Sequence, residues 1–158
     1  MISRRLLLIL GAAPLLIAPA APPASGDATP AYSVEFDLSA DESLAPVAEK
    51  LRSTFNRSYP KLVERFQNPD HPAPTHIPVI FEKGLDHPAH AAGGKLTFSV
   101  EWFKQHPNDL GVITHETMHI VQGYRSRRNP GWLVEGMADY ARALYGPKTD
   151  GWKMPERL

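Results

Sequence analysis

Two histidines and a glutamate in the second half of the chain have the types and spacing that could hold a metal ion and activate water. The segment reads His115-Glu116-Thr117-Met118-His119. On a helix, residues four apart lie on the same face, so His115 and His119 can direct imidazole nitrogens to one ion. Glu116 can reach a water bound to that ion and take its proton as general base. The motif predicts one Zn²⁺ per chain, with two histidine ligands and a glutamate base.

A catalytic zinc ion needs a third protein ligand and one open position. The chain has no cysteine, so the third ligand must be a histidine or a carboxylate. Gln122 and Arg125 stand where a metzincin motif would have glycine and histidine, which rejects that class. Glu135 and Asp139 share one face of the next predicted helix. Glu135 as ligand and Asp139 as hydrogen-bond partner of a metal-bound histidine would complete the site, as in gluzincins; the reverse assignment stays open.

Other polar side chains have weaker cases for a functional role. Tyr140 follows Asp139 and could donate a hydrogen bond to the oxyanion of a tetrahedral intermediate, or equally pack in the core. His87 and His90, three apart in a loop, could line a cleft. The histidines outside the motif show no ligand spacing and are expected to be exposed or in loops: His71, His76, His87, His90 and His106.

Two segments together resemble the basic secretory protein family of plant and bacterial peptidases. They are residues 112–122 (VITHETMHIVQ) and 131–142 (GWLVEGMADYAR). Their order resembles that of the family, in which an HExxH helix, a short loop and a GLIEGIADYVR-like helix follow one another. The resemblance covers most of the chain from about Tyr32.

The resemblance implies a zincin-like zinc peptidase. It gives His115, Glu116 and His119 the roles of ligand, base and ligand, and it matches Glu135 and Asp139 to the second acidic motif. It also implies that residues 95–100 form an edge strand that binds the backbone of a peptide. Family members usually continue with further helices beyond the position of Leu158, so the resemblance also implies a domain truncated at its C-terminus.

The elements that must position these residues are mixed strands and helices. Asn108 is expected to cap the helix that carries the HExxH motif, and Pro60 to break or kink an early helix. Trp102 and Trp132 are expected in the core. Because strands and helices do not alternate strictly, the predicted class is α+β with a small mixed sheet. Strands are expected at about 32–38, 77–81 and 95–100, helices at 41–67, 108–121 and 132–145, and irregular structure at 82–94.

The N-terminus and the charge balance suggest where the protein acts and what it contacts. A basic start and an apolar run predict an export signal over 1–26, then a linker over 27–31 and a peptidase domain over 32–158. Ser3-Arg4-Arg5 resembles a twin-arginine signal. Basic and acidic residues number 17 each, which gives no electrostatic case for nucleic acid or a membrane surface. We expect a periplasmic or secreted protein that acts on peptides or proteins, without stable membrane association after signal cleavage.

The sequence therefore predicts an exported zinc metallopeptidase. One alternative is a catalytically impaired zinc-binding protein of the same fold, acting as a binding or defence module. The intact Glu116 argues against it, because zinc binding alone does not require that base. A second alternative is a zinc hydrolase that cleaves an ester or a non-peptide amide.

Overall fold

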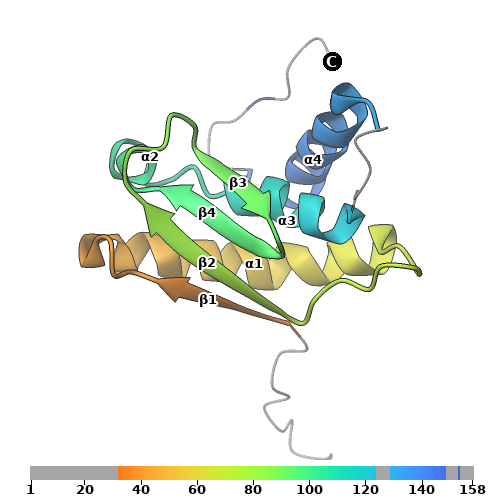
Figure 1. Ribbon diagram of the computed structural model, residues 1–158, viewed down its shortest axis with the longest axis horizontal. Coiled ribbons are helices and arrows are strands. Elements are labelled where there is room, and N and C mark those ends of the chain that lie inside the picture. The colour runs from red at the N-terminus through yellow and green to blue at the C-terminus, as the bar shows by residue number, and fades with distance from the viewer. Residues whose placement is uncertain (1–31, 124–128, 149–152, 154–158) are drawn as a thin grey trace, which may run out of the picture.

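The computed structural model describes residues 32–123, 129–148 and 153 (Figure 1). The predicted export signal and linker lie outside these residues. In chain order the elements are β1 (Ser33–Asp37), the 3-10 helix η1 (Glu42–Leu44), α1 (Ala45–Phe66), β2 (His76–Glu82), β3 (Ala89–Ala92), β4 (Lys95–Ser99), α2 (Val100–Gln105), α3 (Val112–Gln122) and α4 (Gly131–Tyr145). In the described part, no helix has both the length and the apolar character needed to span a bilayer.

The strands form one mixed sheet in the order β1-β2-β4-β3. The pairs β1–β2 and β2–β4 are parallel, and β3–β4 is antiparallel. Alternate side chains of β1 and β2 are buried, among them Val34, Ile77 and Val79, whereas β4 is buried continuously from Leu96 to Ser99. Figure 1 shows α1 and α3 on one side of the sheet, with α4 beside α3. The predicted α+β class with a small mixed sheet is confirmed.

The long helix α1 covers the sheet and has a proline, Pro46, in its first turn, where the missing N–H costs no helical hydrogen bond. It continues through Pro60 to Phe66, so of the predicted break or kink the break is wrong. Proline removes one backbone hydrogen bond inside a helix, at roughly 3 kcal/mol. Buried residues on both sides of it, including Phe55, Tyr59 and Leu62, offset that loss, because each such burial contributes roughly 1.5–3 kcal/mol.

A short hairpin replaces the irregular segment predicted over 82–94. Ala92 pairs with Lys95, and the two residues between them, Gly93 and Gly94, have φ of 60° and 79°. Such a two-residue turn requires positive φ, which glycine adopts readily. The hairpin makes β3 an edge strand of the sheet in the described chain. It also leaves β4 paired on both sides, with β2 and with β3. The predicted edge strand, residues 95–100, is therefore an inner strand, and the edge beside α3 is β3.

The start of the motif helix also differs from the prediction. Helix α3 begins at Val112 after Gly111, without a side-chain cap. Asn108 accepts a hydrogen bond from Lys50 Nζ at 3.2 Å instead. The short helix α2, which the sequence analysis missed, precedes it and is capped by Ser99, whose Oγ accepts from the Trp102 backbone at 3.1 Å.

Helix α3 is the most enclosed of the site-bearing elements, because it contacts α1, α4 and β3. Ile113, Met118 and Val121 are fully buried. Small residues of α4, Ala138 and Ala141, are buried where that helix approaches α3. Trp132, at the start of α4, is 65% exposed, so its predicted core position is wrong. The site residues thus sit on a rigid, buried helix and on a neighbour that packs closely against it.

Glycine is required at the end of α3, and this can be tested. Gly123 has φ of 57°, and a Cβ there would overlap the imidazole of His71. Gly123→Ala should lower the free energy of unfolding by at least about 2 kcal/mol, from the left-handed backbone and the overlap together. Urea unfolding followed by circular dichroism measures the change.

Two matched glycine variants separate the causes. Gly84 has φ of 80° with open space around it, so Gly84→Ala should lose only about 1 kcal/mol. Gly131 starts α4 with open space and no positive φ, so Gly131→Ala should not destabilise. A Gly123 variant as stable as the Gly131 variant would contradict the described helix end.

Candidate metal centre

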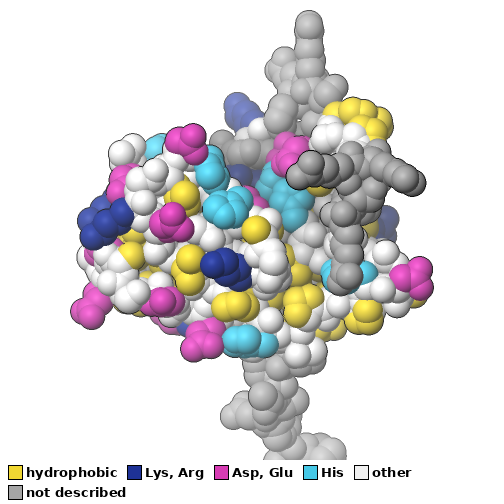
Figure 2. All heavy atoms as spheres, in the orientation of Figure 1, with side chains coloured by type: hydrophobic (Ala, Val, Ile, Leu, Met, Phe, Trp, Pro, Cys, Tyr) yellow, Lys and Arg dark blue, Asp and Glu magenta, His cyan; other side chains and the backbone are white. Residues whose placement is uncertain are grey.

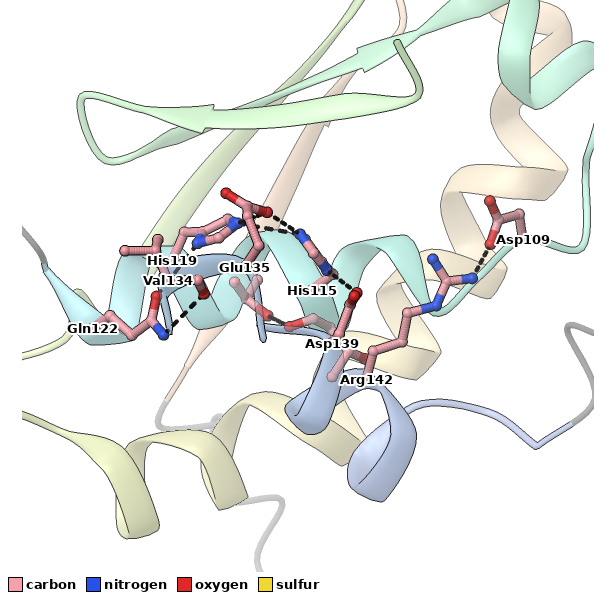
Figure 3. Close-up of polar contacts among 10 residues, drawn as sticks. Asp109, His115, His119, Gln122, Val134, Glu135, Asp139 and Arg142 are labelled. Carbon is pink, nitrogen blue, oxygen red and sulfur yellow. Dashed lines mark hydrogen bonds and ion pairs between the residues drawn. The ribbon is translucent and has the colours of Figure 1, made fainter. Parts of the chain in front are cut away.

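Three side-chain atoms from α3 and α4 converge on one point (Figure 3). Nε2 of His115 lies 3.2 Å from Nε2 of His119. Oε2 of Glu135 lies 3.3 Å from the first nitrogen and 3.5 Å from the second. A tetrahedral ion with bonds of about 2.0–2.1 Å separates its ligands by about 3.3–3.4 Å. The triangle therefore has the dimensions of one face of a zinc coordination tetrahedron.

The outer nitrogens of both histidines are held by acceptors. His115 Nδ1 lies 3.0 Å from Asp139 Oδ1, and His119 Nδ1 lies 3.3 Å from Gln122 Oε1. Gln122 donates its Nε2 to the carbonyl of Val134 at 3.4 Å, which fixes the direction of its amide. Each Nδ1 therefore carries a hydrogen, and each Nε2 presents a lone pair.

Three acceptors thus face one another with no hydrogen between them. Such an arrangement is repulsive unless a cation sits between the atoms. Burial, and then the neighbouring His119, lowers the pKa of His115, while Asp139 and Glu135 act in the opposite direction. A lowered pKa favours the neutral imidazole that binds metal. His115, His119 and Glu135 therefore form a group that could hold a metal ion.

Glu116 lies next to this group and is only 7% exposed. Burial, and then the neighbouring Glu135, raise its pKa to about 7, although His87 and a backbone hydrogen bond from Ala91 act in the opposite direction. A carboxylate with a pKa near the working pH is well suited to accept and return a proton. Through the hydrogen bond from Ala91, Glu116 also contacts β3.

A cavity of about 570 Å³ opens between β3, α3 and α4. His115, Glu116 and His119 line it from α3, and Glu135 and Asp139 from α4. A second hollow of about 500 Å³ shares Ala91 and His119 with it and is otherwise lined mainly by proline, glycine, alanine and isoleucine. In Figure 2, histidine side chains gather where the sheet edge meets the helices. The metal group therefore opens to a cleft large enough for a peptide segment.

The structure brings together the residues that the sequence analysis singled out at the metal group. The two motif histidines, Glu116, Glu135 and Asp139 all lie on the cavity wall. Asp139 lies behind His115, on its Nδ1 side, and Glu135 lies in the triangle, which favours Glu135 as the third ligand. Tyr140 is 40% exposed and is not among the residues that line the cavity. Its catalytic role stays a prediction.

Several residues with a role at this site were missed. Gln122 follows His119 by three positions, and this helical spacing could have identified it as a partner of that histidine. Asp109 pairs with Arg142 and accepts from Trp102 Nε1 at 2.9 Å, which ties α4 to the loop before α3. No short-range signal in the sequence links Asp109 to Arg142, 33 residues away.

Comparison with known proteins decides the family. The model of the family described as "Peptidase of plants and bacteria" matches residues 31–157, which is most of the chain. The chain belongs to this family. The match confirms the resemblance to the basic secretory protein family seen in the two motifs. Searches of curated proteins and of solved structures found no match. The metal group and Glu116 thus lie within the part of the chain that is shared with this peptidase family.

The ligand assignment can be tested by metal affinity. Glu135→Gln removes an atom of the triangle and should abolish binding of one zinc per chain, whereas Asp139→Asn should weaken it about 10–100-fold. Competition with a chromophoric chelator measures both. Glu64→Gln, on the exposed face of α1, is the matched control and should bind zinc as the wild type does. Stronger loss in the Asp139 variant would reverse the assignment.

Burial of the charged carboxylate of Glu116 should destabilise the metal-free fold. A folded-state pKa of about 7 against an ordinary value of 4.5 corresponds to about 3 kcal/mol. Because the pKa is raised, this contribution to stability is present below pH 4.5 and is lost as the pH rises through 7. Metal-free Glu116→Gln should therefore be more stable than wild type at pH 8.5 and similar at pH 4, as measured by urea unfolding. Equal stabilities at pH 8.5 would contradict a buried, strained base.

Proposed function

We propose that this protein is an exported zinc metallopeptidase with a zincin-like site. The observation that carries the proposal is the triangle of three acceptors with Glu116 beside it. Zinc suits this donor set, because two imidazoles and a carboxylate with one open position are typical of catalytic zinc sites. Membership of a peptidase family supports peptides as the substrate class.

The residues of the site can carry out hydrolysis in an ordered way. A bound zinc ion would polarise the substrate carbonyl and lower the pKa of its water to about 7. Glu116 takes one proton from the attacking water and later gives it to the leaving nitrogen. Asp139 and Gln122 hold the two histidine rings, so their Nε2 lone pairs stay directed at the ion. The products are a carboxylate and an ammonium group, and both protons of the water end on the leaving nitrogen, the second after the new carboxylic acid loses it.

The edge of β3 is suited to bind an extended peptide. In a two-residue hairpin closed by Ala92 and Lys95, alternate residues of β3 point their backbone groups away from β4. These residues are Ala89 and Ala91, and the backbone N–H of Ala91 donates a hydrogen bond to Glu116. The carbonyl of Ala91 and both backbone groups of Ala89 are then oriented to pair with a substrate strand. A peptide bound there would run directly past Glu116.

The proposal predicts that zinc binding and turnover can be separated. Glu116→Gln should keep one zinc per chain and lose at least about 100-fold in kcat on casein or on a quenched fluorescent peptide library. Chelation should abolish wild-type activity, and zinc should restore it. Binding of peptides without cleavage by the zinc-loaded wild type would favour the binding module instead. Cleavage of small esters but not peptides would favour a different zinc hydrolase.

A further inference from the structure

A chain of hydrogen bonds runs from solvent to the sheet side of the cavity. Asp86 Oδ1 lies 2.6 Å from His87 Nδ1, and His87 Nε2 lies 2.9 Å from His90 Nδ1. Asp86 and His87 are exposed, whereas His90, on β3, is half-buried and lines the cavity with Glu116. Within the described residues, Nε2 of His90 has no hydrogen-bond partner. The chain therefore ends on a ring nitrogen that is available to a bound molecule.

The carboxylate at one end of this chain of hydrogen bonds determines which ring nitrogens carry a hydrogen. The carboxylate of Asp86 only accepts, so Nδ1 of His87 carries a hydrogen. When His87 is neutral, its Nε2 accepts from Nδ1 of His90, and Nε2 of His90 presents a lone pair. When the pair gains one proton, His87 donates to His90, and Nε2 of His90 carries a hydrogen. One proton thus converts this nitrogen from an acceptor to a donor.

The proposed reaction needs a hydrogen-bond donor in the cavity for the carbonyl oxygen of the substrate. Attack of water on a peptide carbonyl puts negative charge on its oxygen, and aligned N–H groups stabilise that charge. Among the described side chains that line the cavity, Gln122 is held by His119 and Val134, and Arg142 is paired with Asp109. His90 also lines the cavity, its Nε2 has no partner among the described residues, and it lies on the strand proposed to bind the substrate.

We propose that His90 is a further catalytic residue, which donates a hydrogen bond from Nε2 to the substrate carbonyl oxygen as that oxygen becomes an oxyanion. Asp86 and His87 are positioning residues that orient the ring and supply its hydrogen. This assignment rests on the proposed peptidase function of the same cavity. In the step, water oxygen bonds to the carbonyl carbon, the π electrons move to the carbonyl oxygen, and Glu116 takes the water proton. His90 keeps its hydrogen throughout, so the step needs no other acid.

Titratable and charged groups of both signs share the cavity or the hydrogen-bond chain with His90. His87 is close enough to influence the ionisation of Glu116. Across the hairpin, His90 is opposite Thr97, which does not titrate. The titratable and charged groups that line the cavity or share the chain are Asp86 and His87 before β3, His115, Glu116 and His119 on α3, and Glu135, Asp139 and Arg142 on α4.

Kinetics of three variants test the assignment. With zinc content equal to wild type, His90→Ala should lower kcat about 100-fold with little change in KM. His90→Gln keeps an N–H donor, so it should recover much of kcat. Asp86→Asn removes the charged acceptor of the chain, so it should lower kcat by less than His90→Ala does. His76→Ala is the matched control, because His76 also sits on a strand beside a carboxylate, outside the cavity.

Affinity for a transition-state mimic gives a readout that does not depend on turnover. A phosphinic peptide presents an anionic oxygen where the oxyanion forms, so calorimetry on zinc-loaded His90→Ala should show about 100-fold weaker binding than wild type. An uncleaved peptide bound to zinc-loaded Glu116→Gln should lose little affinity when His90→Ala is added. Wild-type kcat and phosphinic affinity in the His90 variant would overturn the proposal. A zinc-loaded wild type that cleaves nothing would overturn the peptidase function instead, and the phosphinic affinities would still decide whether His90 donates to a bound oxyanion.

Discussion

The site depends on three lone pairs that are held close together although they repel one another. Nε2 of His115, Nε2 of His119 and Oε2 of Glu135 repel one another without a cation, so packing must hold them in place. The buried helix α3 fixes the two histidines, the small residues of α4 let Glu135 approach, and Asp139 and Gln122 fix the ring orientations. The hydrophobic core therefore stabilises an arrangement that its polar atoms alone would disfavour, and the proposed function requires that arrangement.

The same opposition between packing and electrostatics appears at Glu116, the proposed catalytic base. Glu116 is buried beside Glu135, which raises the free energy of its charged form and with it the pKa. Only one backbone hydrogen bond, from Ala91, and the nearby His87 act in the other direction. A carboxylate in a polar, solvated position would destabilise the fold less, but it would be a weaker base at neutral pH.

How well a feature could be predicted depends mainly on how far apart in the sequence the interacting residues lie. The motif residues and the pair Glu135 and Asp139 were found because helical spacing is a local rule, and the family motifs gave their order. The hairpin at Gly93 and Gly94 was missed, although two glycines between short runs are a local turn signal. Pro60 was misjudged because burial on both sides, a tertiary effect, outweighs a local rule. The position of β4 inside the sheet depends on pairing with β2, which no local pattern reveals.

The spacing of the ligands along the chain has a consequence for folding. His115 and Glu135 are 20 positions apart by their numbering, and α3 and α4 contact each other directly. Closing so short a loop costs little conformational entropy, so the metal group belongs to a local unit of two helices. The support for Glu116 comes instead from Ala91 on β3, at the edge of the sheet. The proposed metal binding and the ionisation of Glu116 therefore depend on different parts of the fold, the helix pair for the first and the sheet edge for the second.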